Sequence, residues 1–372
     1  MTCWKTRTPL SCPTDEKEDG VPGHDTPHEK PPPTSSHHGQ PGGRRRGWSS
    51  GRRAACTALS AAGIALLLAA CSTASDPTAS ATGTAAPART SAAARTSPAA
   101  GLIRGSYVAL GDSYTSGPDI PDQTGATAGC DQSSSSYPYL VARSLRLKLT
   151  DVSCSSATIA SLAAAQSTGD GTNPAQLSAL SPATALVTLG IGGNDVGWVQ
   201  IITRCTEMDL IPALIPGRTA SGLTPCQDYY TAGGTNVIEQ RTQSVARQLG
   251  EALTRIRQRA PRARVYVVGY PDLFPAGGDA CADALGLTKG DVAFLNDEEL
   301  RFNGMLRQAA QAAKAGYINT YTPSEGHNAC SAPASRWIEP LIPDAPAAPL
   351  HPNAAGEQGM ADAVVGTIRG AA

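Results

Sequence analysis

Residues 102–372 alternate short apolar runs with longer segments of helical periodicity, and this alternation limits the possible folds more than any other feature of the chain. The apolar runs are bounded by Gly, Pro or Asn, as is typical of buried parallel strands. Strands are expected at 107–110, 148–152, 185–189, 265–268 and 317–321. Helices are expected at 237–259, 292–315 and 354–369. This order predicts an α/β domain, a three-layer α/β/α sandwich around a central parallel sheet.

The residues before this domain differ from it in composition. Residues 1–50 are rich in Pro, Gly, His and Ser and hold too few apolar residues to offset the entropy lost on folding. We interpret them as a disordered extension, or as coding sequence upstream of the true start. Residues 72–101 are rich in Ser, Thr, Ala and Pro and have no apolar period, so they are expected to form a flexible linker.

Residues 51–71 lie between these two segments and have the pattern of an export signal peptide. Two arginines precede a short apolar run that ends in small residues. The end, Leu68-Ala69-Ala70-Cys71, resembles the lipobox of bacterial lipoproteins, which implies cleavage before Cys71 and attachment of a lipid to its thiol. An ordinary signal peptide or an uncleaved anchor is the alternative. In each case the domain is expected outside the cytoplasm, as a membrane lipoprotein or a secreted protein.

The cysteines of the domain support the same compartment. They are Cys130, Cys154, Cys205, Cys226, Cys281 and Cys330. An even set of cysteines in an exported domain predicts disulfides, here three of them. Several pairings are possible, and we favour pairing in sequence order because it closes the shortest loops. No close Cys-x-x-Cys pair is present, so no metal site is expected.

In an open parallel sheet, functional side chains collect at the carboxyl ends of the strands. The first predicted strand ends in "GDSY", which places Ser113 at a strand-to-helix turn. A serine hydroxyl becomes a nucleophile only when a base accepts its proton. The domain contains two histidines, His327 and His351, both on loops. These residues alone do not decide which histidine is the base.

The third predicted strand ends in "GIGGND", which supplies hydrogen-bond donors to the same edge of the sheet. Gly192 and Gly193 allow a tight turn, and Asn194 carries an amide N–H₂. Fixed donors stabilise the negative charge that develops on a carbonyl oxygen during acyl transfer. The sequence therefore predicts acyl-transfer chemistry at this edge. Asp112 and Asp195 are each expected to order their own turn through local hydrogen bonds rather than to bind a metal.

Three blocks, "GDSY", "GGND" and the late "HPN" at 351–353, occur in the order of the SGNH hydrolases, also called GDSL esterases and lipases. The domain resembles that family over almost its whole length. The resemblance implies a flavodoxin-like sheet and hydrolysis of carboxylic esters. It implies that Ser113 is the nucleophile and that His351, rather than His327, is the base. The Ser113 N–H and Asn194 would then belong to the oxyanion hole. The cysteine spacing further resembles secreted actinobacterial esterases and lipases of this family.

The chain departs from the family pattern at two positions. The second block usually has a glycine whose N–H helps to bind the oxyanion. Here "CSSAT" has Ser156 in that place, with Ser155 and Ala157 as alternative donors. The family often has an aspartate three residues before the histidine, and here that residue is Ala348. We expect the main-chain carbonyl of Ala348 to orient the histidine, because Asp344 reaches it only if the loop folds back.

The sequence thus predicts an extracytoplasmic serine esterase or lipase that forms an acyl-enzyme on Ser113, with His351 as general base. The substrate is expected to be a small-molecule or lipid ester, with its acyl chain and alcohol left open. We expect a monomer without a cofactor, attached to the membrane through Cys71. The formal net charge of −1 gives no footprint for nucleic acid. The alternative is a catalytically inert envelope lipoprotein that binds acylated or sugar ligands with the same fold.

Overall fold

A five-stranded sheet forms the centre of the computed structural model, which describes residues 103–213, 222–277 and 281–371. Its strand order is β2-β1-β5-β6-β7, and each strand is parallel to its neighbours. Counted within this sheet, the order is that of a doubly wound, flavodoxin-like fold. The predicted parallel α/β sheet is therefore confirmed.

The strands of the sheet coincide with the predicted apolar runs, with one clear difference. Their bounds are β1 Ser106–Gly111, β2 Lys148–Asp151, β5 Thr184–Gly190, β6 Arg264–Val268 and β7 Gly316–Ile318. β7 ends earlier than the predicted strand because the Asn319 side chain accepts hydrogen bonds from the Tyr321 and Thr322 N–H groups. The chain then turns into helix α10 (Tyr321–Ser324). A separate hairpin of β3 (Gln166–Thr168) and β4 (Gly171–Asn173) is not among the predicted strands.

Three long helices correspond to the predicted ones: α7 (Val237–Arg259), α9 (Lys289–Ala312) and α11 (Ala354–Gly370). Helix α9 begins before the predicted residue 292 because the Thr288 hydroxyl caps it, accepting a hydrogen bond from the Asp291 N–H. The other helical elements are shorter or were not anticipated from periodicity. They are α1 Ser113–Ser116, α2 Tyr137–Leu145, α3 Ile159–Ala163, η1 Gln176–Ala179, α4 Gly193–Val196, α5 Trp198–Ala213, α6 Pro225–Tyr230, η3 Ala232–Gly234 and α8 Ala282–Leu285.

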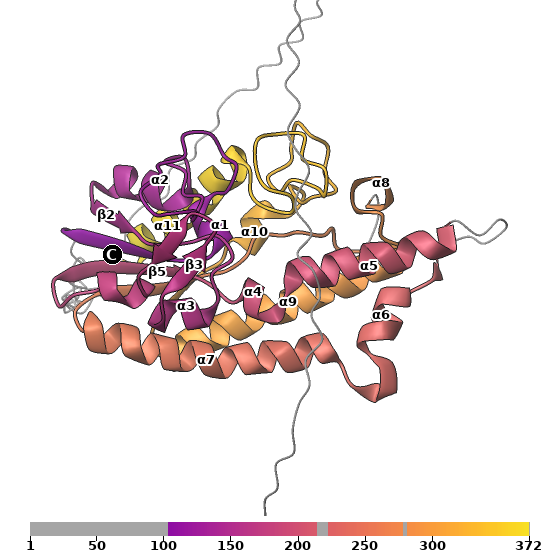
Figure 1. Ribbon diagram of the computed structural model, residues 1–372, viewed down its shortest axis with the longest axis horizontal. Helices are drawn as coiled ribbons and strands as arrows, with labels where there is room; N and C mark the ends of the chain where they lie inside the picture. Colours follow the sequence, from indigo (N-terminus) through magenta and orange to yellow (C-terminus); the bar gives the residue numbers. More distant parts are fainter. Residues whose placement is uncertain (1–102, 214–221, 278–280, 372) are drawn as a thin grey trace, which may run out of the picture. The chain divides into compact units, whose positions relative to one another are not determined.

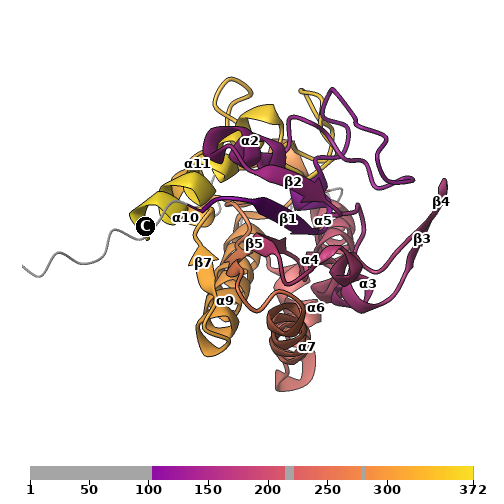
Figure 2. The ribbon, with the colours of Figure 1, turned by 90° about the vertical axis from the view of Figure 1, so that its left-hand side faces the viewer.

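The sheet is covered by helices on both faces. In β1, Tyr107 and Ala109 pack in one core cluster with residues of α2 and α11, whereas Val108 and Leu110 pack in another with residues of α3, α7 and α9. Figure 1 shows α7 and α9 running together along one side of the sheet. Figure 2 shows α2 and α11 on the other side. Successive side chains of a strand point to opposite faces of the sheet, so helices pack on both faces and give the predicted three layers.

The segments before the domain are outside the described residues. This concerns the predicted extension at 1–50, the signal peptide with Cys71, and the linker at 72–101. Within the described ranges, no helix is both long enough and apolar enough to cross a membrane.

The three disulfides join the cysteines in sequence order, as predicted. They are Cys130–Cys154, Cys205–Cys226 and Cys281–Cys330. The first joins the loop between α1 and α2 to Cys154, the first residue of the "CSSAT" segment that follows β2.

The centre of the sheet is also the point at which its connections diverge. β1 and β5 lie side by side, and the chain continues from β1 to the outer strand β2 but from β5 to β6 on the opposite side. Open α/β sheets leave a crevice at such a point, outside the carboxyl ends of the strands. The register pairs Gly111 with Gly190. "GDSY" and "GIGGND" therefore leave the sheet at the same level.

Candidate active site

Ser113 is the first residue of the short helix α1, directly after β1. Asp112 caps this helix, and its carboxylate accepts a hydrogen bond from the Tyr114 N–H at 3.0 Å. The turn requires a glycine before the cap. A Cβ on Gly111 would lie 2.2 Å from Thr115 Oγ1 and 2.6 Å from the Gly190 carbonyl oxygen. The sequence "GDS" therefore fixes the position of the serine through sterics and capping.

His351 lies against Ser113, although the two residues are 238 positions apart. His351 Nε2 is 2.7 Å from Ser113 Oγ, and both side chains are largely buried. His351 Nδ1 is 2.7 Å from the carbonyl oxygen of Pro349. A carbonyl only accepts hydrogen bonds, so Nδ1 carries the proton and Nε2 is left to accept the serine proton.

The carbonyl that orients His351 is therefore not the one predicted. The Ala348 carbonyl accepts a hydrogen bond from the His351 main-chain N–H at 3.1 Å, as part of the turn. Leu350 has a φ of 63°, and this left-handed residue closes the turn so that the Pro349 carbonyl meets the ring. The prediction of Ala348 is wrong by one residue because spacing along the chain does not specify the direction of each carbonyl in a tight turn.

Asp344 and His327, the alternatives that the sequence offered for orienting the histidine and for the base, lie away from Ser113. Asp344 forms an ion pair with Arg336 at 2.6 Å and is largely exposed. His327 stacks on Trp337 with ring centroids 4.5 Å apart, and its Nδ1 bonds to a main-chain carbonyl. Neither residue lines the cavity that contains Ser113.

The loop that carries His351 is held by buried hydrogen bonds. The Glu339 N–H donates to the His351 carbonyl at 3.0 Å, and the Glu339 carboxylate accepts from Asn353 Nδ2 at 2.7 Å. Asn353 also caps α11 through its side-chain oxygen. On the other side, the Tyr114 hydroxyl donates to the Leu350 carbonyl, and the Tyr114 ring packs 4.9 Å from the imidazole. The imidazole is thus fixed from two sides.

Burial lowers the pKa of His351 below its ordinary value, and the Pro349 carbonyl and the charge of Asp119 oppose this shift only in part. The neutral imidazole, which is the form able to accept a proton, is therefore favoured.

Asn194 lines the same cavity as Ser113 and His351. It follows Gly192, whose φ of 115° marks the turn out of β5. One hydrogen of Asn194 Nδ2 is used in a bond of 2.9 Å to the Ala157 carbonyl. This bond orients the amide and leaves its second hydrogen available.

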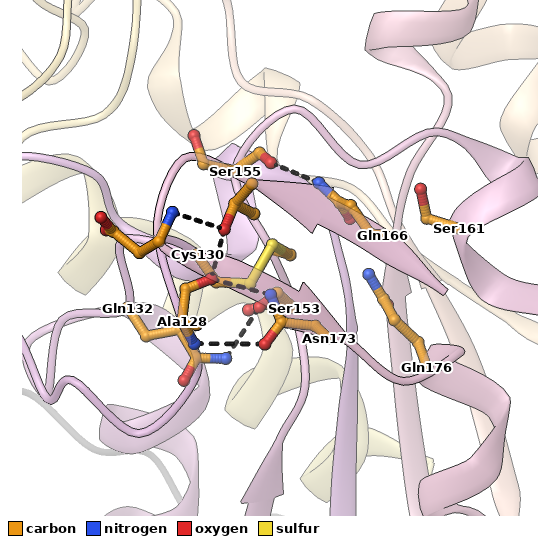
Figure 3. Close-up of a disulfide and its surroundings, with 12 residues drawn as sticks. Ala128, Cys130, Gln132, Ser153, Ser155, Ser161, Gln166, Asn173 and Gln176 are labelled. Atoms are coloured by element: carbon orange, nitrogen blue, oxygen red, sulfur yellow. Dashed lines mark hydrogen bonds between the residues drawn. A yellow bond between two sulfur atoms is a disulfide. The ribbon is translucent and has the colours of Figure 1, made fainter. Parts of the chain in front are cut away.

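Ser156 has a φ of 62°, a left-handed conformation that favours glycine. The neighbouring N–H groups are occupied, since Ser155 donates to Cys130 and Ala157 to Cys154. The Ser156 N–H donates to no group in the described part of the chain. Figure 3 shows the Cys130–Cys154 disulfide and the Gln166 side chain, which donates to the Ser155 carbonyl and holds this turn. Ser156 is exposed and is not among the residues that line the cavity.

A buried network that the sequence did not predict joins these elements. The Tyr270 hydroxyl donates to the Asp112 carboxylate and accepts from the Gly193 N–H at 2.9 Å. Burial raises the pKa of Asp112 to about 7, against the opposing hydrogen bonds of Tyr270 and Tyr114. Tyr270 lies two residues after the fourth predicted strand, so the rule that functional side chains collect at strand ends indicated its region but not its partners.

Asp195, the aspartate of "GGND", accepts a hydrogen bond from its own backbone N–H and also bonds outside its turn. Asp195 accepts a hydrogen bond from the Ile159 N–H at 3.0 Å, at the start of α3. This bond joins α4 to the segment that follows Ser156 and so supports the position of that turn.

The cavity beside Ser113 has an empty volume of about 530 Å³ including its mouth, and most of its wall is apolar. The aliphatic side chains, with Trp and Phe, are Trp198, Val199, Ile202, Leu273, Phe274, Phe302 and Leu350. Glu299 also lines it, with both carboxylate oxygens near the Leu273 N–H. Burial, together with the charge of Asp272, raises the pKa of Glu299 well above its usual range. Across the described residues, no cluster of three or more His, Cys, Asp or Glu side chains could hold a metal.

Comparison with known proteins identifies relatives of the whole domain. Residues 109–358 match the model of the GDSL-like Lipase/Acylhydrolase family. "Lipase 2" of Streptomyces coelicolor is 40% identical over 258 residues, which cover 69% of this chain and 83% of that protein. "Esterase" of Streptomyces scabiei is 30% identical over 261 residues, which cover 64% of this chain and 75% of that protein.

Two solved structures from Streptomyces share the fold. The extracellular lipase from Streptomyces rimosus superposes with a TM-score of 0.57 at 26% identity, covering 72% of this chain and 100% of that chain. The phospholipase A1 from Streptomyces albidoflavus NA297 gives a TM-score of 0.57 at 26% identity, covering 72% of this chain and 99% of that chain.

Replacing Tyr270 with Phe would leave the Gly193 N–H and the Asp112 carboxyl without their shared partner. A buried group that loses its hydrogen bond costs about 1–3 kcal/mol, so the free energy of unfolding is expected to fall by about 2 kcal/mol or more. Urea denaturation of the oxidised protein measures this change. Tyr229→Phe, at an exposed phenol, is the matched control. Equal stability of the two variants would show that the network contributes little.

Proposed function

The chain belongs to the GDSL-like lipase/acylhydrolase family and is a carboxylic ester hydrolase, and we propose that Ser113 is its nucleophile and His351 its general base. The observation that carries this assignment is the 2.7 Å distance between Ser113 Oγ and His351 Nε2. The orientation of the ring by Pro349 supports it, because the free lone pair of Nε2 then faces the hydroxyl.

In the proposed reaction, Ser113 Oγ attacks the ester carbonyl while His351 Nε2 accepts the hydroxyl proton. The Pro349 carbonyl stabilises the resulting imidazolium, less strongly than a carboxylate would. The imidazolium then gives its proton to the departing alcohol, which leaves an acyl-enzyme on Ser113. A water molecule, deprotonated by His351, hydrolyses this intermediate by the same route.

We propose that three donors bind the oxyanion: the N–H groups of Ser113 and Ser156 and the amide of Asn194. Neither N–H group donates to another part of the described chain, and the amide retains one free hydrogen. The left-handed φ of Ser156 supports its equivalence to the family glycine. A donor that needs no reorganisation stabilises the transition state by a few kcal/mol.

The apolar wall of the cavity supports an ester with an apolar acyl chain as the substrate. In this proposal the chain lies against Trp198, Leu273 and Phe302. Glu299 does not contradict it, because its raised pKa favours the neutral acid. The names of the relatives, lipases and an esterase, agree with this substrate class. The inert ligand-binding alternative is not favoured by any observation of the site.

We further propose that the enzyme works outside the cytoplasm, held at the membrane by a lipid on Cys71. The three disulfides support an oxidising compartment. The relative from Streptomyces rimosus is described as extracellular.

A fluorophosphonate probe is expected to label the protein, and Ser113→Ala is expected to abolish labelling and ester hydrolysis. His351→Ala should lower kcat by about 10²–10⁴-fold, because general base catalysis is lost. His327→Ala is the matched control and should retain nearly full activity. Absence of labelling in folded, oxidised protein would refute the nucleophile, and a larger loss in His327→Ala would refute the base.

The pH dependence of kcat/KM follows from the lowered pKa of His351. Activity requires the neutral imidazole, so it falls as the pH drops through the pKa of the folded protein. The midpoint of this acidic limb is expected below about 6.5, the value of an unperturbed histidine. Initial rates on a neutral ester between about pH 4 and 8 measure it. A midpoint above about 7 would contradict the assigned environment of the base.

Val199 lies half exposed at the cavity, and its replacement by Trp is expected to narrow the acyl site. The ratio of kcat/KM for long-chain over short-chain p-nitrophenyl esters should fall by about tenfold, equivalent to about 1.4 kcal/mol. Leu210→Trp, on the same helix α5 and similarly exposed but outside the cavity, is the control. An unchanged ratio for Val199→Trp would mean that the acyl chain binds elsewhere.

A further inference from the structure

At the edge of the sheet opposite the candidate active site, the charged side chains of the described segments are all positive. Because the strands are parallel, their starts and the ends of the helices that precede them lie at this edge, together with the end of α11. We call it the basic edge, and it comprises residues 103–105, 143–148, 181–184, 255–264, 313–316 and 369–371. Every charged residue in these segments is Arg or Lys. The chain has a formal net charge of −1, so this charge is strongly segregated.

Two arginines of the basic edge, Arg257 and Arg262, hold the fold together through hydrogen bonds to main-chain carbonyls rather than through ion pairs within the described residues. Arg257 donates to the Ala313 carbonyl at 2.7 Å, and Arg262 donates to the Pro182 carbonyl at 2.9 Å. Cations at helix ends are stabilised by such carbonyls. A carbonyl is neutral, however, so these bonds fix the guanidinium groups without cancelling their charge.

Four arginines of the basic edge surround one cleft: Arg104, Arg146, Arg264 and Arg369. No Asp or Glu side chain lines the cleft, and none of the four forms an ion pair within the described residues. Arg104 and Arg146 are exposed. The partly exposed side chains of Ile103 and Leu145 line the same cleft.

We propose that the basic edge docks on the surface of an anionic phospholipid bilayer. Guanidinium groups pair with phosphate in a bidentate manner, and many arginines spread over a whole edge suit an array of headgroups better than one small anion. Ile103, the first described residue, lines the cleft, so the described part of the chain begins at this edge. A basic surface is attracted to the negative charge of anionic lipids, and each Arg or Lys near the bilayer adds to this attraction.

This docking turns the candidate active site away from the bilayer. Ser113 lies at the carboxyl end of β1 and Arg104 before its start, on opposite edges of the sheet. Esters would then reach the enzyme from the outer medium rather than from the membrane beneath it; this consequence rests on the proposed function, whereas the docking itself does not.

Binding of the purified full chain to sedimenting vesicles tests the proposal. Vesicles of phosphatidylcholine alone and with phosphatidylglycerol are compared for three proteins: the parent, Arg104→Gln/Arg146→Gln, and Arg204→Gln/Arg247→Gln. The control pair is also exposed and removes the same charge from α5 and α7. All three share the N-terminal residues, so the contribution of those residues cancels. The basic-edge variant is expected to bind phosphatidylglycerol vesicles about tenfold or more weakly than the control pair.

Two results would overturn the proposal. One is equal affinity of the two double variants for phosphatidylglycerol vesicles, with both proteins folded by circular dichroism. The other is a loss of binding to heparin, a soluble polyanion, without a loss of binding to vesicles, which would indicate a polymer partner. Esterase activity is not used in either measurement, so failure of the proposed function would not affect the outcome.

Discussion

The parallel pairing of β1 with β5 is the constraint on which the candidate site depends. It brings Gly111 beside Gly190, and the Asp112 N–H then donates to the Gly190 carbonyl at 2.9 Å. From this level "GDSY" and "GIGGND" diverge around one crevice, and the Tyr270 hydroxyl joins them from the end of β6. A shift of register by one residue would turn every side chain of β1 to the other face and separate the serine from its donors.

Most of the fold follows from local sequence patterns. Buried strands and amphipathic helices produce patterns within short stretches of sequence, so the five strands of the main sheet and the three longest helices were predicted within a few residues. The turn after Ile318 was missed because a single asparagine side chain ends the strand there. The sequence also predicted that Ser113, His351 and Asn194 share one site, because each occurs in a short motif, and all three line one cavity. Tyr270 and Pro349 were not, because their roles depend on contacts between segments that are distant in sequence.

The distribution of charge over the surface likewise cannot be predicted from composition. The formal net charge of −1 indicated only that the chain lacks the excess of positive charge typical of nucleic-acid binding. The parallel sheet instead collects the ends of α2, α7, α9 and α11 at one edge, and helix ends favour cations. The segregation of charge is therefore a product of topology, and a sum over the chain conceals it.

The orientation of His351 by a main-chain carbonyl also affects how the site tolerates mutation. A carboxylate partner is lost by one substitution at one codon, whereas the Pro349 carbonyl is present whichever amino acid occupies that position. The orientation of His351 depends instead on the conformation of the turn, and Leu350, Tyr114 and Glu339 together hold that conformation. The third element of the proposed catalytic group thus depends on several residues that contribute packing and hydrogen bonds, and no single residue of the sequence identifies it.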